Sequence, residues 1–204
     1  MIMNTVHITT GSSKMLGLQS INTPTTSNAF CSKLASVEGS ICSGCYAARY
    51  EKLRPTLPEA TSRNLFMTQR ALTAREIPVI NASIFRFHSY GELHNAQHLL
   101  NYIAIAVSNP DTIFTLWTKR TNIVNAVFDN QLASKPKNLI LVHSTLGTDA
   151  TPTRLPRYFD KVFSVFTKKG AVLGSVDINC HSSCNECRLC YSHNDVTFIN
   201  EIKK

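Results

Sequence analysis

Segments with strand periodicity and segments with helix periodicity alternate over residues 82–166, and this alternation constrains the fold more than any other feature. Apolar residues recur at i, i+3 and i+4 spacing from Leu93 to Val107, and Asn109 with Pro110 ends the pattern, which predicts an amphipathic helix. The predicted order is strand 82–88, helix 93–107, strand 112–117, helix 121–133, strand 139–143 and strand 162–166. Strands joined through helices predict an α/β fold, a parallel sheet with crossover helices in an open sheet or a partial (β/α) barrel.

The two ends of the chain depart from this pattern. Residues 1–30 are rich in Ser, Thr and Asn and predict a loop-like segment with one short strand at 5–10. Residues 58–76 follow a proline and carry mixed helical spacing, which predicts a helix. We divide the chain into an α/β domain at 1–173 and a C-terminal segment at 174–204, which holds a cysteine-rich run and a short apolar tail at 196–202.

All seven cysteines fall into two groups. The first is a C-x10-C-x2-C pattern and the second a C-x3-C-x2-C-x2-C pattern: Cys31, Cys42 and Cys45, then Cys180, Cys184, Cys187 and Cys190. Two thiolates separated by two residues can converge on one metal centre, because a tight turn points both sulfurs inward. Clustering at these spacings favours ligands over unliganded buried cysteines.

The spacing also bears on the metal. Zinc ribbons place their cysteine pairs about 15–20 residues apart, so the denser four-cysteine run favours an iron–sulfur cluster, with zinc as the alternative. Four cysteines would saturate a [4Fe–4S] cubane, whereas three would leave one iron open for a cofactor or substrate. The sequence therefore predicts one or two [4Fe–4S] clusters.

Charge and hydropathy limit the partners. The chain has 21 Lys and Arg against 13 Asp and Glu, a net charge of +8, but these basic residues are scattered and indicate nucleic acid only weakly. No apolar stretch approaches the ~18 residues of a membrane span, so we expect no membrane partner. The first residues lack a secretory pattern, which predicts a cytoplasmic location, in the host cytoplasm if the protein is viral. Because the cytoplasm is reducing, we expect the cysteines to be free thiols and not disulfides.

Four segments resemble the phage gene product 88 family over most of the chain: CSGCYA at 42–47, FRFHSYGEL at 85–93, FTLWTKR at 114–120 and CRLCY at 187–191. More loosely, the first and third of these look like a phage group related to radical S-adenosylmethionine (SAM) enzymes. That resemblance implies a partial barrel in which a three-cysteine loop follows the first strand, here the strand at 5–10, and leaves one iron for SAM.

The same resemblance implies further site residues. A Gly-Glu motif after the second strand contacts the SAM amino group in such enzymes, and Gly91 and Glu92 could correspond to it. The spacing of ten residues between Cys31 and Cys42 departs from the usual three. Cys180, Cys184 and Cys187 match the usual spacing, but they follow the predicted sheet, so we assign them with Cys190 to an auxiliary cluster.

Other polar residues stand where strands are predicted to end. Lys119 and Arg120 could aim cations at a phosphate or carboxylate of a nucleotide-like cofactor, or could form a basic turn. His88 is a further candidate at a strand end. His94 and His98, four residues apart, are interpreted as solvated helix surface rather than metal ligands, and Trp117 as core.

Three hypotheses follow. The first is a phage-type iron–sulfur protein with a radical-SAM-like fold, which would need an electron donor if it is an enzyme. The second is a non-catalytic electron-transfer or structural cluster protein that does not bind SAM. The third is a zinc-stabilised protein that binds nucleic acid. The sequence leaves open whether the protein is an enzyme, and which substrate it would use.

Overall fold

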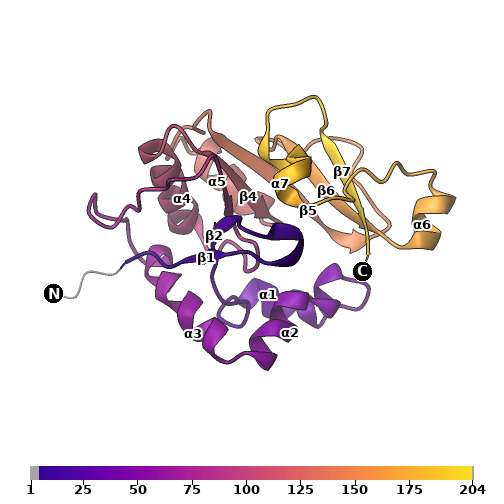
Figure 1. Cartoon of the computed structure of the whole chain (residues 1–204), viewed down its shortest axis with the longest axis horizontal. Coiled ribbons are helices and arrows are strands. Elements are labelled where there is room, and N and C mark those ends of the chain that lie inside the picture. The colour runs from indigo at the N-terminus through magenta and orange to yellow at the C-terminus, as the bar shows by residue number, and fades with distance from the viewer. Residues whose placement is uncertain (1–4, 204) are drawn as a thin grey trace.

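The structure is a computed structural model that describes residues 5–203 and contains one seven-stranded sheet. The strands lie in chain order: β1 Ile8–Thr10, β2 Gln19–Ile21, β3 Ile84–Phe87, β4 Ile113–Thr118, β5 Leu139–Thr148, β6 Lys161–Phe166 and β7 Phe198–Ile202 (Figure 1). The first pair, β1 and β2, is antiparallel, and all later neighbours are parallel. The predicted α/β class with a parallel sheet is confirmed, while closure toward a partial barrel stays a prediction.

Helices connect most of these strands. Their bounds are α1 Ala29–Ala35, α2 Tyr46–Leu53, α3 Thr56–Ser62, α4 Ala96–Ser108, α5 Thr121–Asp129, α6 Lys168–Leu173 and α7 Cys184–Cys187, with 3-10 turns η1 Ser13–Met15, η2 Ile41–Gly44, η3 Arg63–Thr68 and η4 Leu189–Tyr191. Asn95 caps α4 by accepting a hydrogen bond from the His98 N–H. Figure 1 shows α4 at one end of the molecule with α5 beside it, α6 at the opposite end, and α7 nearer the middle.

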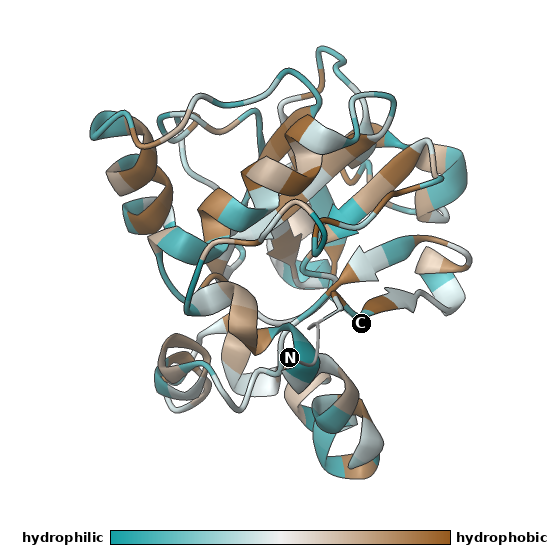
Figure 2. Cartoon of the chain, turned by 90° about the vertical axis from the view of Figure 1, so that its left-hand side faces the viewer, coloured by the Kyte–Doolittle hydropathy of each residue, from teal (hydrophilic) through white to brown (hydrophobic). Residues whose placement is uncertain are grey.

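The period-two alternation of the strands builds two apolar layers, one on each face of the sheet. Phe85 and Phe87 of β3 face the larger layer, which packs under α4 and α5, whereas Ile84 of the same strand faces the other. On β5, Leu141 and Val142 divide in the same way. Figure 2 shows apolar residues concentrated in the central strands, with more hydrophilic loops around them.

The second layer is covered by the cysteine-rich C-terminal segment. Its buried members include Cys190 and Tyr191, with Cys180 and Cys184 partly buried against them. The Thr115 hydroxyl of β4 donates to the Cys190 main-chain oxygen at 3.1 Å. The segment also contributes β7 to the sheet, through pairing with β6. The division of the chain at residue 173 into two parts stays a prediction.

The elements predicted between 82 and 166 are confirmed in type and order, although β5 continues to Thr148 and α5 ends at Asp129, and the N-terminal half differs more. The loop-like interpretation of residues 1–30 missed β2, whose three residues are too few to show periodicity, and the start of α1. The helix predicted at 58–76 is wrong beyond residue 62, where η3 and turns follow. Asn101 explains this change, because its Nδ2 donates to the Met67 and Arg70 carbonyls at 2.7 Å each and supplies bonds outside a helix.

The interpretation of His94 and His98 as solvated helix surface is wrong. His94 precedes the N-cap of α4 and is half-buried, and His98 is fully buried. The His98 ring packs on His88 and Tyr102, so it belongs to the core beneath α4. Trp117 is half-buried and packs on Phe163. Within residues 5–203, no helix is both long and apolar enough to cross a bilayer.

Candidate functional site

The first cysteine group lies where β3 and β4 end. Cys31 sits in α1, Cys42 in η2, and Cys45 between η2 and α2. Burial, together with negative charge on Glu92, Cys42 and Cys45, raises the pKa of Cys31 to about 12, while Lys119 opposes the shift. These groups therefore lie close enough to sense one another's charge. The structure brings together the three predicted thiols with Glu92 and Lys119.

Local hydrogen bonds hold the segments that carry these thiols. The Asn28 side chain caps α1 through the Phe30 N–H at 3.0 Å, and its Nδ2 donates to the Glu92 carbonyl at 3.0 Å. The Ser40 hydroxyl accepts from the Cys42 N–H at 3.1 Å and starts η2. The Tyr46 hydroxyl donates to the Ser89 carbonyl and ties the start of α2 to the loop after β3. The thiols are thus supported by contacts between distant parts of the chain.

Glu92 is buried and accepts several hydrogen bonds. Oε1 accepts from the Leu93 N–H at 2.7 Å and from the Thr118 hydroxyl, and Oε2 accepts from the Lys119 N–H at 2.8 Å. Burial raises the pKa of Glu92, and the hydrogen bonds from Thr118 and Lys119 oppose that shift. Each carboxylate oxygen has two lone pairs, and one lone pair of Oε2 takes no part in these three bonds. Glu92 thus joins the ends of β3 and β4 and keeps capacity for one further donor.

Gly91 stands at a position that suits only glycine. Its φ is +86°, and a Cβ built there would lie 2.4 Å from the Thr23 main-chain oxygen. A side chain at Gly91 would therefore push the loop after β3 away from the loop after β2. The close approach of these two loops fixes the position of Glu92, the next residue.

The other three predicted cofactor contacts differ in their surroundings. Lys119 Nζ donates to the Ser144 hydroxyl on β5 and lies near Cys31 and Cys42. The Arg120 guanidinium stacks over the Phe30 ring at 4.7 Å and donates to the Leu93 carbonyl at 3.2 Å, so it anchors α1. His88 Nε2 lies 3.1 Å from the Tyr102 hydroxyl, and burial lowers its pKa to about 3. The His88 ring thus packs with core aromatics.

Two unpartnered polar atoms accompany the first group. Within residues 5–203, Thr23 Oγ1 and His143 Nδ1 are buried and have no hydrogen-bond partner. Thr23 follows β2, and His143 lies on β5 near enough to Lys119 for that cation to lower its pKa, together with burial as the larger cause. Buried polar atoms are normally bonded, so Thr23, against Gly91, and His143, near Lys119, are candidate contacts for a polar ligand.

The second cysteine group covers the opposite face of the sheet. Cys184 and Cys187 start and end α7, Cys180 precedes it, and Cys190 lies in η4. Burial raises the pKa of the Cys190 thiol well above its usual value; Arg86 opposes this shift, and charge on the other three thiols would add to it. The Cys190 thiol therefore lies within electrostatic reach of the other three predicted thiols of this group.

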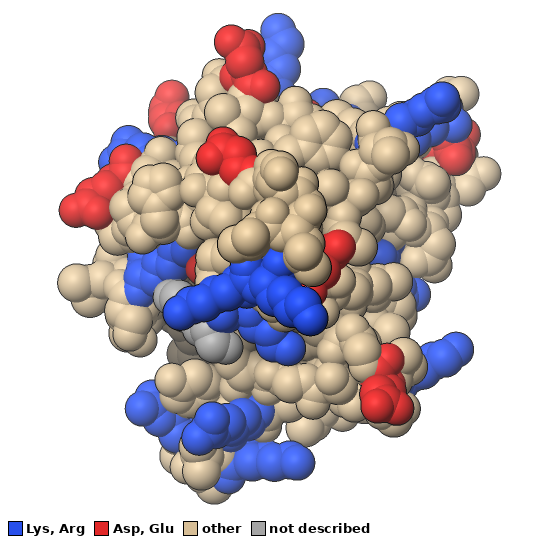
Figure 3. Space-filling model, turned by 90° about the vertical axis from the view of Figure 1, so that its right-hand side faces the viewer, with Lys and Arg blue, Asp and Glu red and all other residues tan. Residues whose placement is uncertain are grey.

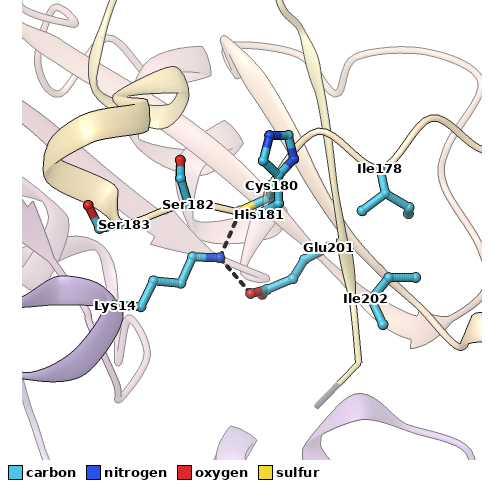
Figure 4. A pocket seen from close by; sticks show the side chains of 8 residues that line it. All are labelled: Lys14, Ile178, Cys180, His181, Ser182, Ser183, Glu201 and Ile202. Atoms are coloured by element: carbon cyan, nitrogen blue, oxygen red, sulfur yellow. Dashed lines mark hydrogen bonds and ion pairs between the residues drawn. The ribbon is translucent and has the colours of Figure 1, made fainter.

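Cations from three separate segments reach the second group. Lys14 Nζ donates to Cys180 Sγ at 3.1 Å and to Glu201 Oε1 at 2.6 Å, beside a cavity of about 460 Å³ (Figure 4). Lys161 is buried, and this burial lowers the pKa of its ammonium group. The charge of Cys190 opposes that shift. Arg86 is buried on β3. Sequence inspection missed all three cations. The sole signal was the alternation of side chains along β3, which places Arg86 on this face of the sheet.

Binding of a metal centre by either cysteine group stays a prediction. All seven cysteines lie within the described residues and are free thiols. Within residues 5–203, no three or more His, Cys, Asp or Glu side chains converge closely enough to hold a single metal ion. A zinc ion holds its thiolates about 2.3 Å from one centre, whereas a cubane offers each cysteine a different iron and so takes a wider ring of thiolates.

Comparisons with known proteins give one match. The family model described as Gene product 88 matches residues 4–196 of this chain. The curated proteins and the solved structures contain no match to it. The match includes Glu92, Lys119 and every cysteine of both groups.

Proposed function

This chain belongs to the gene product 88 family, and we propose that it is an iron–sulfur protein with two cluster sites. Cys31, Cys42 and Cys45 form a three-cysteine [4Fe–4S] site, and the four C-terminal cysteines form a saturated one. The observation that carries this proposal is the gathering of all seven thiols into two groups, one beside the ends of β3 and β4 and one on the far face of the sheet. Single structural cysteines would have no reason to divide in this way.

Charges around each group support bound, negatively charged centres. Lys119 lies beside the first group, and Lys14, Arg86 and Lys161 lie beside the second. Burial raises the pKa of Cys31 and Cys190, so these thiols hold their protons in the absence of metal, and ligand formation must release them. Cations nearby favour the thiolate form that a cluster requires.

We further propose that the first site binds SAM, with three cysteines leaving one iron for it. Glu92 Oε2 would accept the SAM amino group, and Lys119 Nζ would meet its carboxylate. Bound SAM would supply radical chemistry through its one-electron reductive cleavage. Six parallel strands in chain order support this proposal, because a partial (β/α) barrel requires that order. In this arrangement β2, and not the strand at 5–10, is the first parallel strand.

The main alternative is a cluster protein without SAM chemistry. Most acceptor positions of Glu92 are already taken by main-chain and hydroxyl donors, and a purely structural role for this carboxylate would need no cofactor. Such a protein would transfer electrons or stabilise the fold through its clusters. If both clusters are present but SAM does not change the EPR spectrum, this alternative is favoured over the SAM-binding proposal.

A zinc-stabilised protein that binds nucleic acid is the second alternative. Figure 3 shows Lys and Arg side chains gathered in the middle of the face where β7 and the C-terminus lie. A basic patch of this kind attracts anionic partners, including the nucleic-acid backbone or an acidic electron donor. Zinc without sulfide, together with salt-sensitive affinity for DNA or RNA, would support this alternative.

The deciding experiment measures iron, acid-labile sulfide and zinc in anaerobically purified protein, with electron paramagnetic resonance (EPR) of the reduced form before and after SAM addition. We expect about eight irons per chain and a spectrum that SAM perturbs. Two matched double variants, Cys42→Ala with Cys45→Ala and Cys184→Ala with Cys187→Ala, should each lose about four irons. Only the first of them should also lose the response to SAM. Purified protein with zinc and no sulfide would refute the iron–sulfur proposal.

A further inference from the structure

A buried guanidinium lies beside the four-cysteine group. Arg86 belongs to β3 and has an exposed fraction of 9%. Its carbon Cζ stands 4.0 Å from the centroid of the Trp117 ring, and Nε donates to the His88 carbonyl at 3.1 Å. Nη1 reaches the Tyr191 hydroxyl and the Met15 sulfur at 3.4 Å each. The side chain is thus fixed between the sheet and the C-terminal segment.

Among the residues that the structure describes, no carboxylate forms an ion pair with Arg86. The ion pairs formed within residues 5–203 join Lys14 to Glu201, Arg70 to Glu76, Lys135 to Asp160 and Arg157 to Asp129. Arg86 has none, although arginine stays charged at every pH the protein meets. A buried charge without a partner lowers the free energy of unfolding by several kcal/mol, so buried charges in native proteins are normally paired with an opposite charge or bound to a metal centre. The acidic groups within its electrostatic reach are the phenols of Tyr191 and Tyr46 and the thiols of Cys184 and Cys190, and of these only the thiols can become metal-bound thiolates.

We propose that Arg86 is the buried counter-charge of a metal centre held by the four C-terminal cysteines. This inference rests on the proposed function, because it requires that these thiols bind a metal. A centre with four thiolates carries net negative charge, and reduction of an iron–sulfur cluster adds one more electron. The Arg86 cation stabilises that charge, and more strongly in the reduced state. Arg86 is a positioning and tuning residue that does not coordinate the metal.

Nearby cations do not replace it. Lys14 is compensated by Glu201, and Lys161 donates to the Asn194 and Val196 oxygens at 2.8 Å each. Lys161 also has the Asp160 carboxylate near enough to raise its pKa. The Arg86 position is held from both sides, by Trp117 of β4 and by Tyr191 of η4. It therefore offers charge where the C-terminal segment meets the sheet.

The test measures the midpoint potential of the four-cysteine centre by EPR-monitored redox titration. The background is Cys42→Ala with Cys45→Ala, which removes the first site, reconstituted anaerobically with ferrous iron and sulfide. Arg86→Met should lower the potential by at least about 59 mV, a tenfold change in the one-electron equilibrium constant. Arg86→Lys should restore most of the difference, because it keeps the charge. Arg75→Met, at an exposed position, is the matched control and should leave the potential unchanged.

The outcomes separate this inference from the proposed function. Equal potentials and equal iron content in wild type, Arg86→Met and Arg86→Lys would overturn the role of Arg86 while leaving the cluster proposal intact. Failure of the background protein to bind either iron with sulfide or zinc would overturn both. If Arg86→Met does not fold, Arg86→Gln against Arg86→Lys makes the same comparison of neutral and charged side chains. If the centre holds zinc, the same variants should weaken zinc affinity about tenfold against a chelator, and equal affinities would refute the inference.

Discussion

Asn28 donates a hydrogen bond from Nδ2 to the main-chain oxygen of Glu92 at 3.0 Å, across 64 residues of sequence. Its Oδ1 accepts from the Phe30 N–H at the start of α1. One buried amide therefore connects the helix that carries Cys31 to the loop that carries Glu92. The geometry of the first cysteine group depends on this connection.

Asn28→Ala should destabilise the fold by roughly 2–3 kcal/mol, because it removes a helix cap and leaves buried main-chain oxygens unpaired. It should also reduce iron retained by the first group and leave the second unchanged. Urea unfolding and iron content measure both effects. Asn95→Ala, which removes the cap of α4, is the control and should lower stability by about 1 kcal/mol without loss of iron. Equal iron loss in both variants would contradict the role of Asn28.

Gly91→Ala should destabilise the protein by more than about 2 kcal/mol, because it adds a contact with Thr23 to the strain of positive φ. Gly39→Ala is the matched control, since Gly39 has a φ of +77° and no atom within 4 Å of its added Cβ. The control should lose only about 1–2 kcal/mol. Thermal and urea unfolding compare the two, and equal losses would show that the approach to Thr23 contributes nothing.

Glu76 should make stability depend on acid pH. Arg70 and the Thr73 N–H hydrogen-bond its carboxylate and lower its pKa from 4.5 to about 2. Below pH 4.5 Glu76 is protonated in the unfolded chain, whereas in the folded protein it stays ionised down to about pH 2. Its contribution to the free energy of unfolding is therefore full above pH 4.5 and is lost as the pH falls from 4.5 to about 2. Glu76→Gln should flatten this part of the profile of unfolding free energy against pH, and Glu59→Gln, at an exposed site, should not.

Cys187→Ala should lower the melting temperature and the metal content together, because a ligand contributes folding energy as well as chemistry. The loss should be localised to the C-terminal segment, where proteolysis or hydrogen exchange would detect it. Ser183→Ala is the control in the same segment, since its hydroxyl donates to the exposed Glu186 carboxylate. An unchanged melting temperature and metal content in Cys187→Ala would remove this residue from the ligand set.

The central part of the fold was predictable because its signals are local. Apolar residues of α4 recur on one face, and Asn95 caps its start, so both the type and the position of this element follow from neighbouring residues. Strands β3 to β6 are flanked by turns and contain enough residues to show periodicity. The N-terminal half gave weaker signals, because β2 has three residues and depends on pairing with β3 for its conformation.

The sequence by itself determined the α/β order, the family and the division of seven cysteines into groups of three and four. Only the tertiary structure decided what surrounds them: Glu92 and Lys119 beside Cys31, Arg86 beside Cys190, and His98 in the core. The physical reason is the separation in sequence of the residues that interact. Periodicity and capping act between residues a few positions apart, whereas the packing of the C-terminal segment on the sheet brings together side chains separated by more than a hundred residues, as Arg86 and Tyr191 are.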